Sequence, residues 1–167
     1  MKTNIATTRD QSARLLKCGV PAESADMSWF RGWGNVGDYD LNVKPYSMMV
    51  RINEECCRGR NEIVPAFSLS CLLSLLPKAI SDFWMTKWFS PIEDGFVISD
   101  KEAPYLLSGD FQLLHIGGGK YQVEYDWDGF QGKLPQSDNP IEACVLAIEL
   151  LAANGYQLNG IEKGGEE

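Results

Sequence analysis

The clearest helix signal in the chain runs from residue 137 to residue 156: Ser-Asp-Asn-Pro-Ile-Glu-Ala-Cys-Val-Leu-Ala-Ile-Glu-Leu-Leu-Ala-Ala-Asn-Gly-Tyr. Asn139 is a favoured N-cap residue, and the proline after it suits the first helical position, where a missing N–H is tolerated. Glu142 stands where a capping box places its acidic residue. Gly155 can adopt the left-handed conformation that ends a helix, and the tyrosine after it can make the closing apolar contact. These signals predict a helix over 140–154.

The interior of this segment is apolar almost all round. It is broken mainly by Glu142 and Glu149, which lie two turns apart on one face. A helix that is apolar on most of its surface is buried, so a sheet or a partner subunit must cover it. The segment therefore indicates a folded, layered domain, and it carries no chemistry of its own.

Two further helices are predicted from their N-termini. Thr8 followed by Gln11 forms a capping-box pattern that opens a helix over 9–18. Ser68 is a natural N-cap for a helix over 69–76, in which leucines recur at helical spacing before a proline ends the segment.

Alternation of apolar and polar residues predicts the strands. Residues 46–52 alternate and are expected to form a half-buried strand that returns through 63–64 in a hairpin. The clearest hairpin joins 111–116 to 120–127 across three glycines. Residues 29–46 place three glycines among large aromatic residues and are predicted to be an irregular loop.

Together these elements predict one α+β domain over residues 1–160. An antiparallel sheet is expected, with the helices 9–18, 69–76 and 140–154 packed mainly on one of its faces. The polar end of the chain, 161–167, is predicted to be a disordered tail.

Composition narrows the class of protein. Hydrophobic residues make up 44 % and charged residues 23 %, which is ordinary for a globular domain. No apolar run approaches the ~18–20 residues that cross a bilayer. The N-terminus has no apolar signal segment, and five cysteines without a Cys-x-x-Cys pair favour reduced thiols. We therefore predict a cytoplasmic protein that does not bind membranes.

The charge is unevenly distributed along the chain. Residues 1–90 carry eleven Lys or Arg and nine Asp or Glu, a net +2, whereas residues 91–167 carry four and fourteen, a net −10. The acidic half disfavours direct nucleic-acid binding because it repels phosphate groups. The same acidic half suits a basic protein partner, and it equally suits solubility alone.

Few residues offer catalytic chemistry. The single histidine, His115, lies in the predicted hairpin between apolar residues, which favours a packing or edge position over a catalytic one. The Gly117–Lys120 segment leads into a strand, which is the wrong context for a phosphate-binding loop. No cofactor is predicted.

Three carboxylates, Glu124, Asp126 and Asp128, alternate on one face of the second hairpin strand. Oxygen ligands of this kind could hold Mg²⁺ or Ca²⁺. A solvated sheet face has the same pattern, so a metal site and a simple polar surface both remain open.

The candidate binding surface is the aromatic and glycine-rich loop with Trp29, Phe30, Trp33 and Tyr39. Tryptophan and tyrosine are enriched at interface hot spots, and loops often carry function. The same rings could instead fold back onto the core as a lid. A basic patch in the same half of the chain could touch an acidic partner, although arginines at a hairpin tip are usually only solvated: Arg51, Arg58 and Arg60.

Three islands of sequence, 8–27, 65–77 and 138–145, resemble short uncharacterised proteins encoded in prophages and mobile elements of gut bacteria. The last island is also similar to the terminal helix of the phage α/β/α-sandwich domain family. The shared positions are helix caps and core residues. The resemblance implies a cytoplasmic accessory protein of phage-like origin, and it brings no catalytic residues.

The leading prediction is therefore a non-enzymatic module that binds a protein partner through the aromatic loop, with a homo-oligomer through the long apolar helix as a further expectation. Two alternatives stay open. One is a carboxylate-based metal-dependent enzyme or small-ligand binder, and the other is an acidic nucleic-acid mimic that inhibits a basic protein.

Overall fold

The computed structural model describes residues 5–34, 37–77, 111–116, 118–125, 134–153 and 155–160. In chain order its elements are α1 (Arg9–Lys17), the 3-10 turn η1 (Ala22–Ser24), β1 (Met27–Arg31), β2 (Asp40–Asn42), α2 (Tyr46–Cys57), β3 (Glu62–Ala66), α3 (Leu69–Leu75), β4 (Phe111–Ile116), β5 (Lys120–Tyr125), β6 (Gln136–Ser137) and α5 (Pro140–Ala153). The predicted α+β class is confirmed, but two three-stranded antiparallel sheets, β2-β1-β3 and β4-β5-β6, replace the single sheet that we expected.

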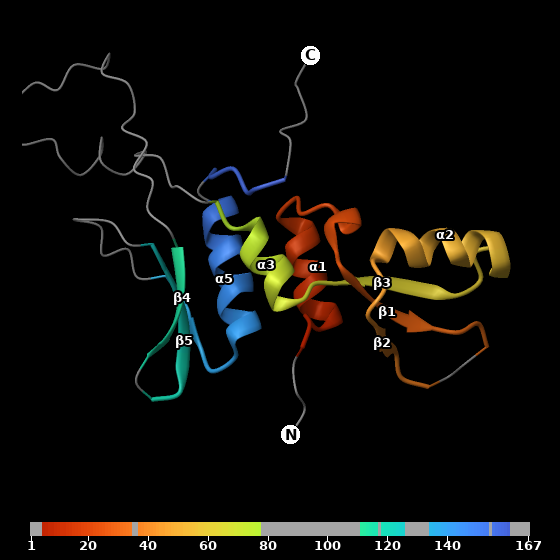
Figure 1. Cartoon of the computed structure of the whole chain (residues 1–167), viewed down its shortest axis with the longest axis horizontal. Helices are drawn as coiled ribbons and strands as arrows, with labels where there is room; N and C mark the ends of the chain where they lie inside the picture. The colour runs from red at the N-terminus through yellow and green to blue at the C-terminus, as the bar shows by residue number, and fades with distance from the viewer. Residues whose placement is uncertain are drawn as a thin grey trace, which may run out of the picture.

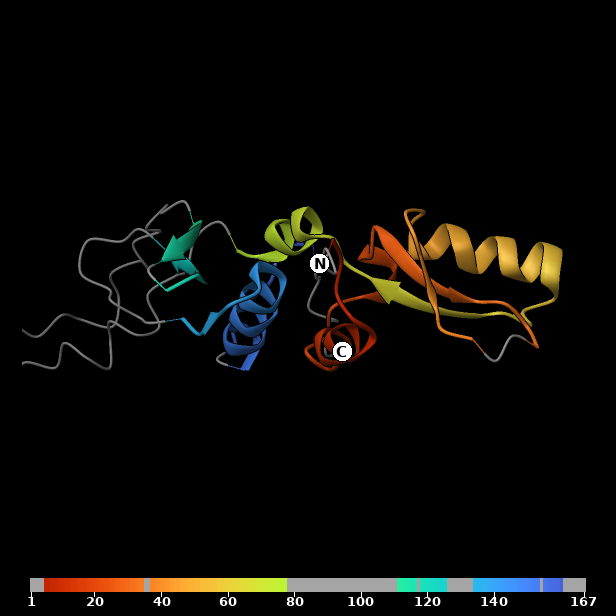
Figure 2. The same cartoon turned by 90° about the horizontal axis from the view of Figure 1, so that it is seen from below.

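The two sheets lie on opposite sides of a central group of helices (Figure 1). α1, α3 and α5 form this group, and the hairpin of β4 and β5 lies beyond α5. The sheet β2-β1-β3 extends from the other side, with α2 along one of its faces (Figure 2). No described helix lies on the opposite face of that sheet.

The core fills the space between the central helices and the second sheet. Its largest fully buried side chains include Leu15 from α1, Leu72 from α3, Val123 from β5 and Ile148 from α5. α5 contributes seven buried residues, so the prediction that this helix is covered on most of its surface is confirmed. None of the described helices has the length and apolar composition that a bilayer-spanning segment requires.

Both ends of α5 follow the sequence signals. The side-chain oxygen of Asn139 accepts a hydrogen bond from the backbone N–H of Ile141 at 2.9 Å. At the other end Gly155 has a φ of 78°, and the Tyr156 N–H donates to the Leu151 carbonyl at 3.0 Å, which is a Schellman arrangement.

The capping box predicted for Glu142 is wrong. The backbone N–H of Asn139 donates to the Ser137 hydroxyl instead, at 3.2 Å. The Glu142 carboxylate accepts from Gln11 at 2.5 Å and from Arg14 at 2.7 Å, both on α1. The Glu142 carboxylate would be the acceptor in either arrangement, but the Arg14 guanidinium is a charged donor and a backbone N–H is not, which accounts for this choice.

The strand predicted over 46–52 is also wrong, because this segment belongs to the helix α2. The alternating pattern was accidental: Met48 is exposed although it stood among the apolar positions. Met49 and Asn53 are the buried residues, and with Tyr46, Val50 and Cys57 at least half-buried they give a helical period.

The loop predicted over 29–46 contains two strands. β1 pairs with β3 on one side and β2 on the other, so that Trp29 lies opposite both Val64 and Leu41. β3 therefore returns to β1 and not to the segment 46–52. Pro65 fits in β3 because this strand lies at the edge of its sheet, where a missing N–H leaves no ladder bond broken.

The hairpin of β4 and β5 is confirmed. Leu113 pairs with Val123, and the turn between the strands uses positive φ at Gly118 and Gly119, of 81° and 72°. Val123 is buried and Glu124 is exposed, as the alternation predicts.

Candidate interaction surface

The four predicted aromatic residues lie in three different environments. Trp29 is half-buried, and its indole N–H donates to the Thr7 carbonyl oxygen at 2.8 Å. Strand alternation places Phe30 on the opposite face of β1, the face of the fully buried Ser28, and Phe30 is itself half-buried. Both rings are therefore partly covered by the rest of the protein.

Tyr39 lies between two arginines. The guanidinium carbon of Arg9 is 4.1 Å from the centroid of the Tyr39 ring, and that of Arg31 is 4.6 Å from it. The Tyr39 hydroxyl donates to Glu62, which also forms an ion pair with Arg31. These contacts lower the pKa of the Glu62 carboxyl, the Tyr39 hydrogen bond most of all. These contacts join α1 to the sheet β2-β1-β3, and both Arg9 and Arg31 are occupied by them.

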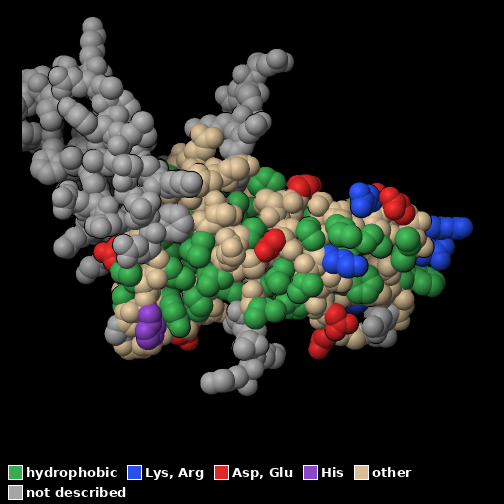
Figure 3. All heavy atoms as spheres, in the orientation of Figure 1, with side chains coloured by type: hydrophobic (Ala, Val, Ile, Leu, Met, Phe, Trp, Pro, Cys, Tyr) green, Lys and Arg blue, Asp and Glu red, His purple; other side chains and the backbone are tan. Residues whose placement is uncertain are grey.

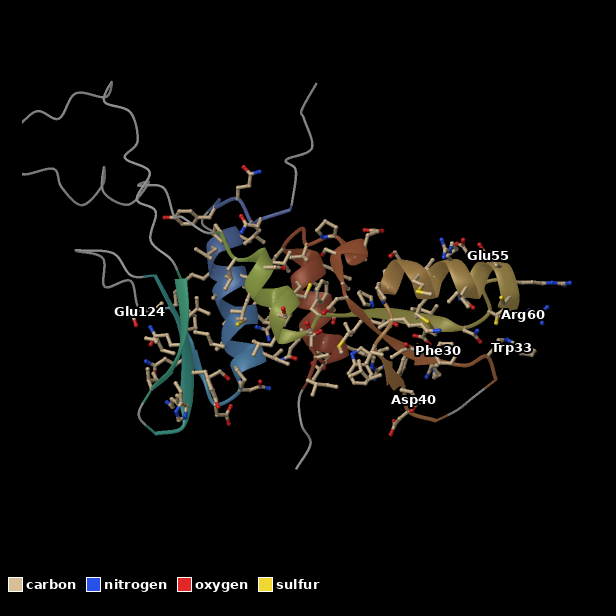
Figure 4. The ribbon with its side chains drawn as sticks, in the orientation of Figure 1. Phe30, Trp33, Asp40, Glu55, Arg60 and Glu124 are labelled. Atoms are coloured by element: carbon tan, nitrogen blue, oxygen red, sulfur yellow. The ribbon has the colours of Figure 1, made fainter. Side chains whose placement is uncertain are left out.

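Trp33 is the exposed member of the set. Its side chain is 71 % exposed in the connection between β1 and β2. The guanidinium of Arg60 lies over its ring, 5.1 Å from the centroid. Figure 4 shows both residues at the end of the molecule that α2 and the sheet reach.

A chain of hydrogen bonds from the interior holds this end in place. Asn53 is buried on α2, and its side chain makes two hydrogen bonds to the backbone of Asn61, at 2.9 and 3.1 Å. The side-chain oxygen of Asn61 in turn accepts from the backbone N–H of Trp33 at 2.8 Å. A buried amide therefore fixes both the connection from α2 to β3 and the position of the tryptophan.

We call Trp33, Arg58, Arg60 and Asn61 the arginine tip. Arg58 and Arg60 are exposed, and the space-filling view shows lysine and arginine side chains gathered at this end of the molecule (Figure 3). Arg51, the third arginine of the predicted basic patch, lies on α2 and pairs with Glu55 at 3.9 Å. Of the predicted basic patch, Arg58 and Arg60 therefore belong to the arginine tip, and Arg51 does not.

Two residues of this region were not identified from the sequence: Asn61 of the arginine tip, and Asn53, which holds Asn61 in place. Asn53 and Asn61 stand in a polar segment and have no motif around them. A helical interpretation of 46–57 would have placed Asn53 on the buried face, where an amide needs hydrogen-bond partners. An amide on the buried face of a helix was therefore the signal that could have identified Asn53.

The structure describes one residue of the predicted carboxylate site. Glu124 is exposed on β5, and Asp126 and Asp128 lie outside the described residues. Within the described ranges no group of three or more His, Cys, Asp or Glu side chains is placed to hold a metal ion. His115 is exposed, and its ring contacts Tyr121 at 5.0 Å between centroids, which is a packing contact.

No protein-family model, no curated protein and no solved structure matches this chain. The resemblance to prophage proteins that we drew from three islands of sequence therefore stays a prediction.

Proposed function

We propose that this chain is a non-enzymatic interaction module that binds a partner protein through the arginine tip. The observation that carries the proposal is Trp33, a large aromatic side chain that is 71 % exposed yet has its backbone held by Asn61. Exposed apolar surface is unfavourable in water, so burial of this tryptophan against a partner would favour association. An accessory role of the kind implied by the prophage resemblance is consistent with such a module.

The two alternatives rest on other parts of the chain. The carboxylate-based enzyme rests on Glu124, which is exposed on β5, and on Asp126 and Asp128, which lie outside the described residues. The acidic mimic rests on residues 91–167, whereas the sheet unit 27–66 carries five Lys or Arg against five Asp or Glu and has no net charge. Neither alternative uses the exposed tryptophan.

The proposal is tested by site-specific crosslinking in a lysate of the cells that encode the chain. The photoreactive residue benzoylphenylalanine replaces Trp33 in one variant and Val43 in a matched control. Val43 is equally exposed at 71 %, but it lies in the connection between β2 and α2. We expect a discrete protein adduct from position 33 and not from position 43.

Equal adducts from both positions, or none from position 33, would count against the proposal. Thermal unfolding of each variant shows whether the fold survives the substitution. Because Trp33 and Val43 are both 71 % exposed, we expect both variants to melt close to the parent protein.

A further inference from the structure

The charges around Trp33 point to the chemistry of the partner. We propose that the arginine tip binds a short acidic protein segment, with an apolar side chain on Trp33 and carboxylates on Arg58 and Arg60. This inference rests on the proposed function and names the partner class for the same surface.

Arg60 is held ready for a carboxylate. A guanidinium that stacks on an aromatic ring keeps its N–H donors in the plane, pointing away from the contact. The guanidinium carbon of Arg60 lies over the Trp33 ring at 5.1 Å from its centroid, a cation–π contact that restricts the side chain without using its N–H donors. A planar carboxylate can accept two parallel hydrogen bonds from such a donor set.

Arg58 occupies a strained position that favours glycine. Its φ is 54°, in the left-handed region, and Gly59 follows with a φ of 69°. Arg58 is the C-cap of α2, where a left-handed residue commonly ends a helix. Because the backbone conformation at position 58 favours glycine, we infer that an arginine is present there for its side chain.

Both arginines are available for a partner. The ion pairs formed within the described residues engage Arg14, Arg31 and Arg51, and none engages Arg58 or Arg60. The two residues are exposed on the same short connection between α2 and β3. They can therefore meet two carboxylates that lie close together in a partner chain.

The surroundings favour an acidic protein segment over a nucleic acid. Glu54 and Glu55 lie in the last turn of α2, and Glu62 begins β3, so carboxylates border the tip on both sides. A nucleic acid carries a continuous row of phosphates and would meet these carboxylates. A short protein segment with two acidic residues fits in the space between the carboxylates that border the arginine tip.

The test is fluorescence anisotropy with the full chain and labelled synthetic peptides at low salt. One peptide carries Asp and Glu on either side of a phenylalanine, and its control carries Asn and Gln at the same positions. We expect the acidic peptide to bind at least about tenfold more tightly, as charge-assisted hydrogen bonds to arginine require. Added salt should weaken this binding.

Variants connect the binding to the tip. The double substitution Arg58→Ala and Arg60→Ala should weaken acidic-peptide binding by at least about tenfold, and Trp33→Ala should weaken it as well. The matched control is Lys44→Ala with Arg51→Ala, which removes two other exposed cations of the sheet unit. It should leave the affinity within about twofold, since exposed charges outside a contact contribute little. Circular dichroism establishes that each variant is folded.

Three kinds of result would overturn the inference. The first is a lack of specificity, seen either as equal affinity for the acidic and amide peptides or as equal loss in the tip and control variants. The second is tighter binding of a labelled single-stranded oligothymidine that the tip variant loses. The third is self-association in sedimentation velocity that the tip variant abolishes, which would make a second copy the occupant.

The two proposals fail separately. If position 33 gives a protein adduct but the tip shows no preference for acidic peptides, the interaction module stands and its partner class is wrong. If position 33 gives no adduct while the acidic peptide binds as described, the surface recognises carboxylates and the protein-partner role falls.

Discussion

At the scale of single residues, Arg58 allows a direct test of backbone strain. Among the described residues it is the only non-glycine residue with a positive φ. The left-handed conformation costs roughly 1–2 kcal/mol for a side-chain-bearing residue, and the greater freedom of glycine in the unfolded chain returns part of this. We expect Arg58→Gly to raise the free energy of unfolding by about 1 kcal/mol, measured by urea denaturation.

Arg60→Gly is the matched control for that substitution. Arg60 lies two positions along the same connection, and its φ is not positive. Glycine there relieves no strain and only loosens the unfolded chain, so stability should fall or stay unchanged. If Arg58→Gly and Arg60→Gly shifted the denaturation midpoint alike, strain at residue 58 would have no part in the stability.

The cysteines are expected to differ strongly in reactivity. Burial raises the pKa of Cys71 to about 11 and that of Cys144 to about 12, whereas Cys56 is exposed. The thiolate is the reactive form, so iodoacetamide at about pH 8 should modify Cys56 first and Cys144 last. Peptide mapping by mass spectrometry gives the order, and labelling in denaturant should remove the difference.

The sign of the pH effect follows from the same pKa shift. The folded protein keeps Cys144 protonated above the ordinary thiol value of 9.0, at which the unfolded chain loses the proton. The stabilisation is therefore complete below about pH 9 and is lost as the pH rises towards about 12. Cys144→Ala should flatten this alkaline decline, and an unchanged slope would show that other groups cause it.

At the scale of elements, Arg14 joins α1 to α5. Its guanidinium contacts Glu142 at 2.7 Å and Glu149 at 2.5 Å, which pairs the two charged residues that interrupt the apolar surface of α5. Both carboxylates raise the Arg14 pKa, chiefly through the Glu149 hydrogen bond, so the guanidinium stays charged. The contact explains how a nearly apolar helix tolerates two glutamates in its packed interface.

We expect Arg14→Ala to lower the free energy of unfolding by about 1–2 kcal/mol, because two half-buried carboxylates then lose their partner. The estimate is reduced for solvent screening, since the Arg14 side chain is 34 % exposed. Arg51→Ala is the control: its pair with Glu55 is exposed on one helix, and its loss should cost at most about 0.5 kcal/mol. Equal effects in urea denaturation would contradict a special role for Arg14.

Local signals predicted the helices well where caps were present. Thr8 and Gln11 form the expected capping box, with hydrogen bonds of 2.8 and 3.2 Å. The partner of Glu142 lay beyond sequence reasoning because Arg14 is 128 residues away, and no local pattern indicates such a contact. α2 was missed because Pro45 caps it without a side-chain hydrogen bond, so no capping signal opposed the apparent alternation.

The candidate site was predicted only in part for a related reason. Trp29 and Trp33 are four residues apart and look alike in the sequence. Trp29 is partly buried by the pairing of β1 with β3 and by its contact with Thr7. Both of these interactions involve residues that are distant in the sequence. Residue type could identify the aromatic set, whereas tertiary structure decided which ring stays exposed.

At the scale of the whole molecule, Thr7 connects the first sheet to the central helices. It is fully buried, and its backbone N–H donates to the Phe67 carbonyl at 2.9 Å. Its hydroxyl accepts from the Phe67 N–H at 2.9 Å and lies 2.8 Å from the Ser12 hydroxyl, while its carbonyl accepts from Trp29. One residue thus ties together α1, β1 and the segment between β3 and α3.

Thr7→Val tests this connection with almost no change of volume. The substitution keeps the backbone bonds but leaves the buried Phe67 N–H without its acceptor, which should lower the free energy of unfolding by about 1–3 kcal/mol. Ser74→Ala is the control, because its hydroxyl is exposed and bonds to Cys71 of the same helix, so its loss should cost at most about 0.5 kcal/mol.

Hydrogen exchange then shows how far the connection reaches. If Thr7 couples the sheet β2-β1-β3 to the helices, amides of β1 and β3 should exchange faster in Thr7→Val, together with the Phe67 amide. Amides of the β4 and β5 hairpin should keep the exchange rates of the parent protein relative to global unfolding, because they pack on α5 through Val123 and Leu113. Uniformly faster exchange throughout the chain would show that the molecule opens as one unit, so that Thr7 supports the whole fold and not this connection alone.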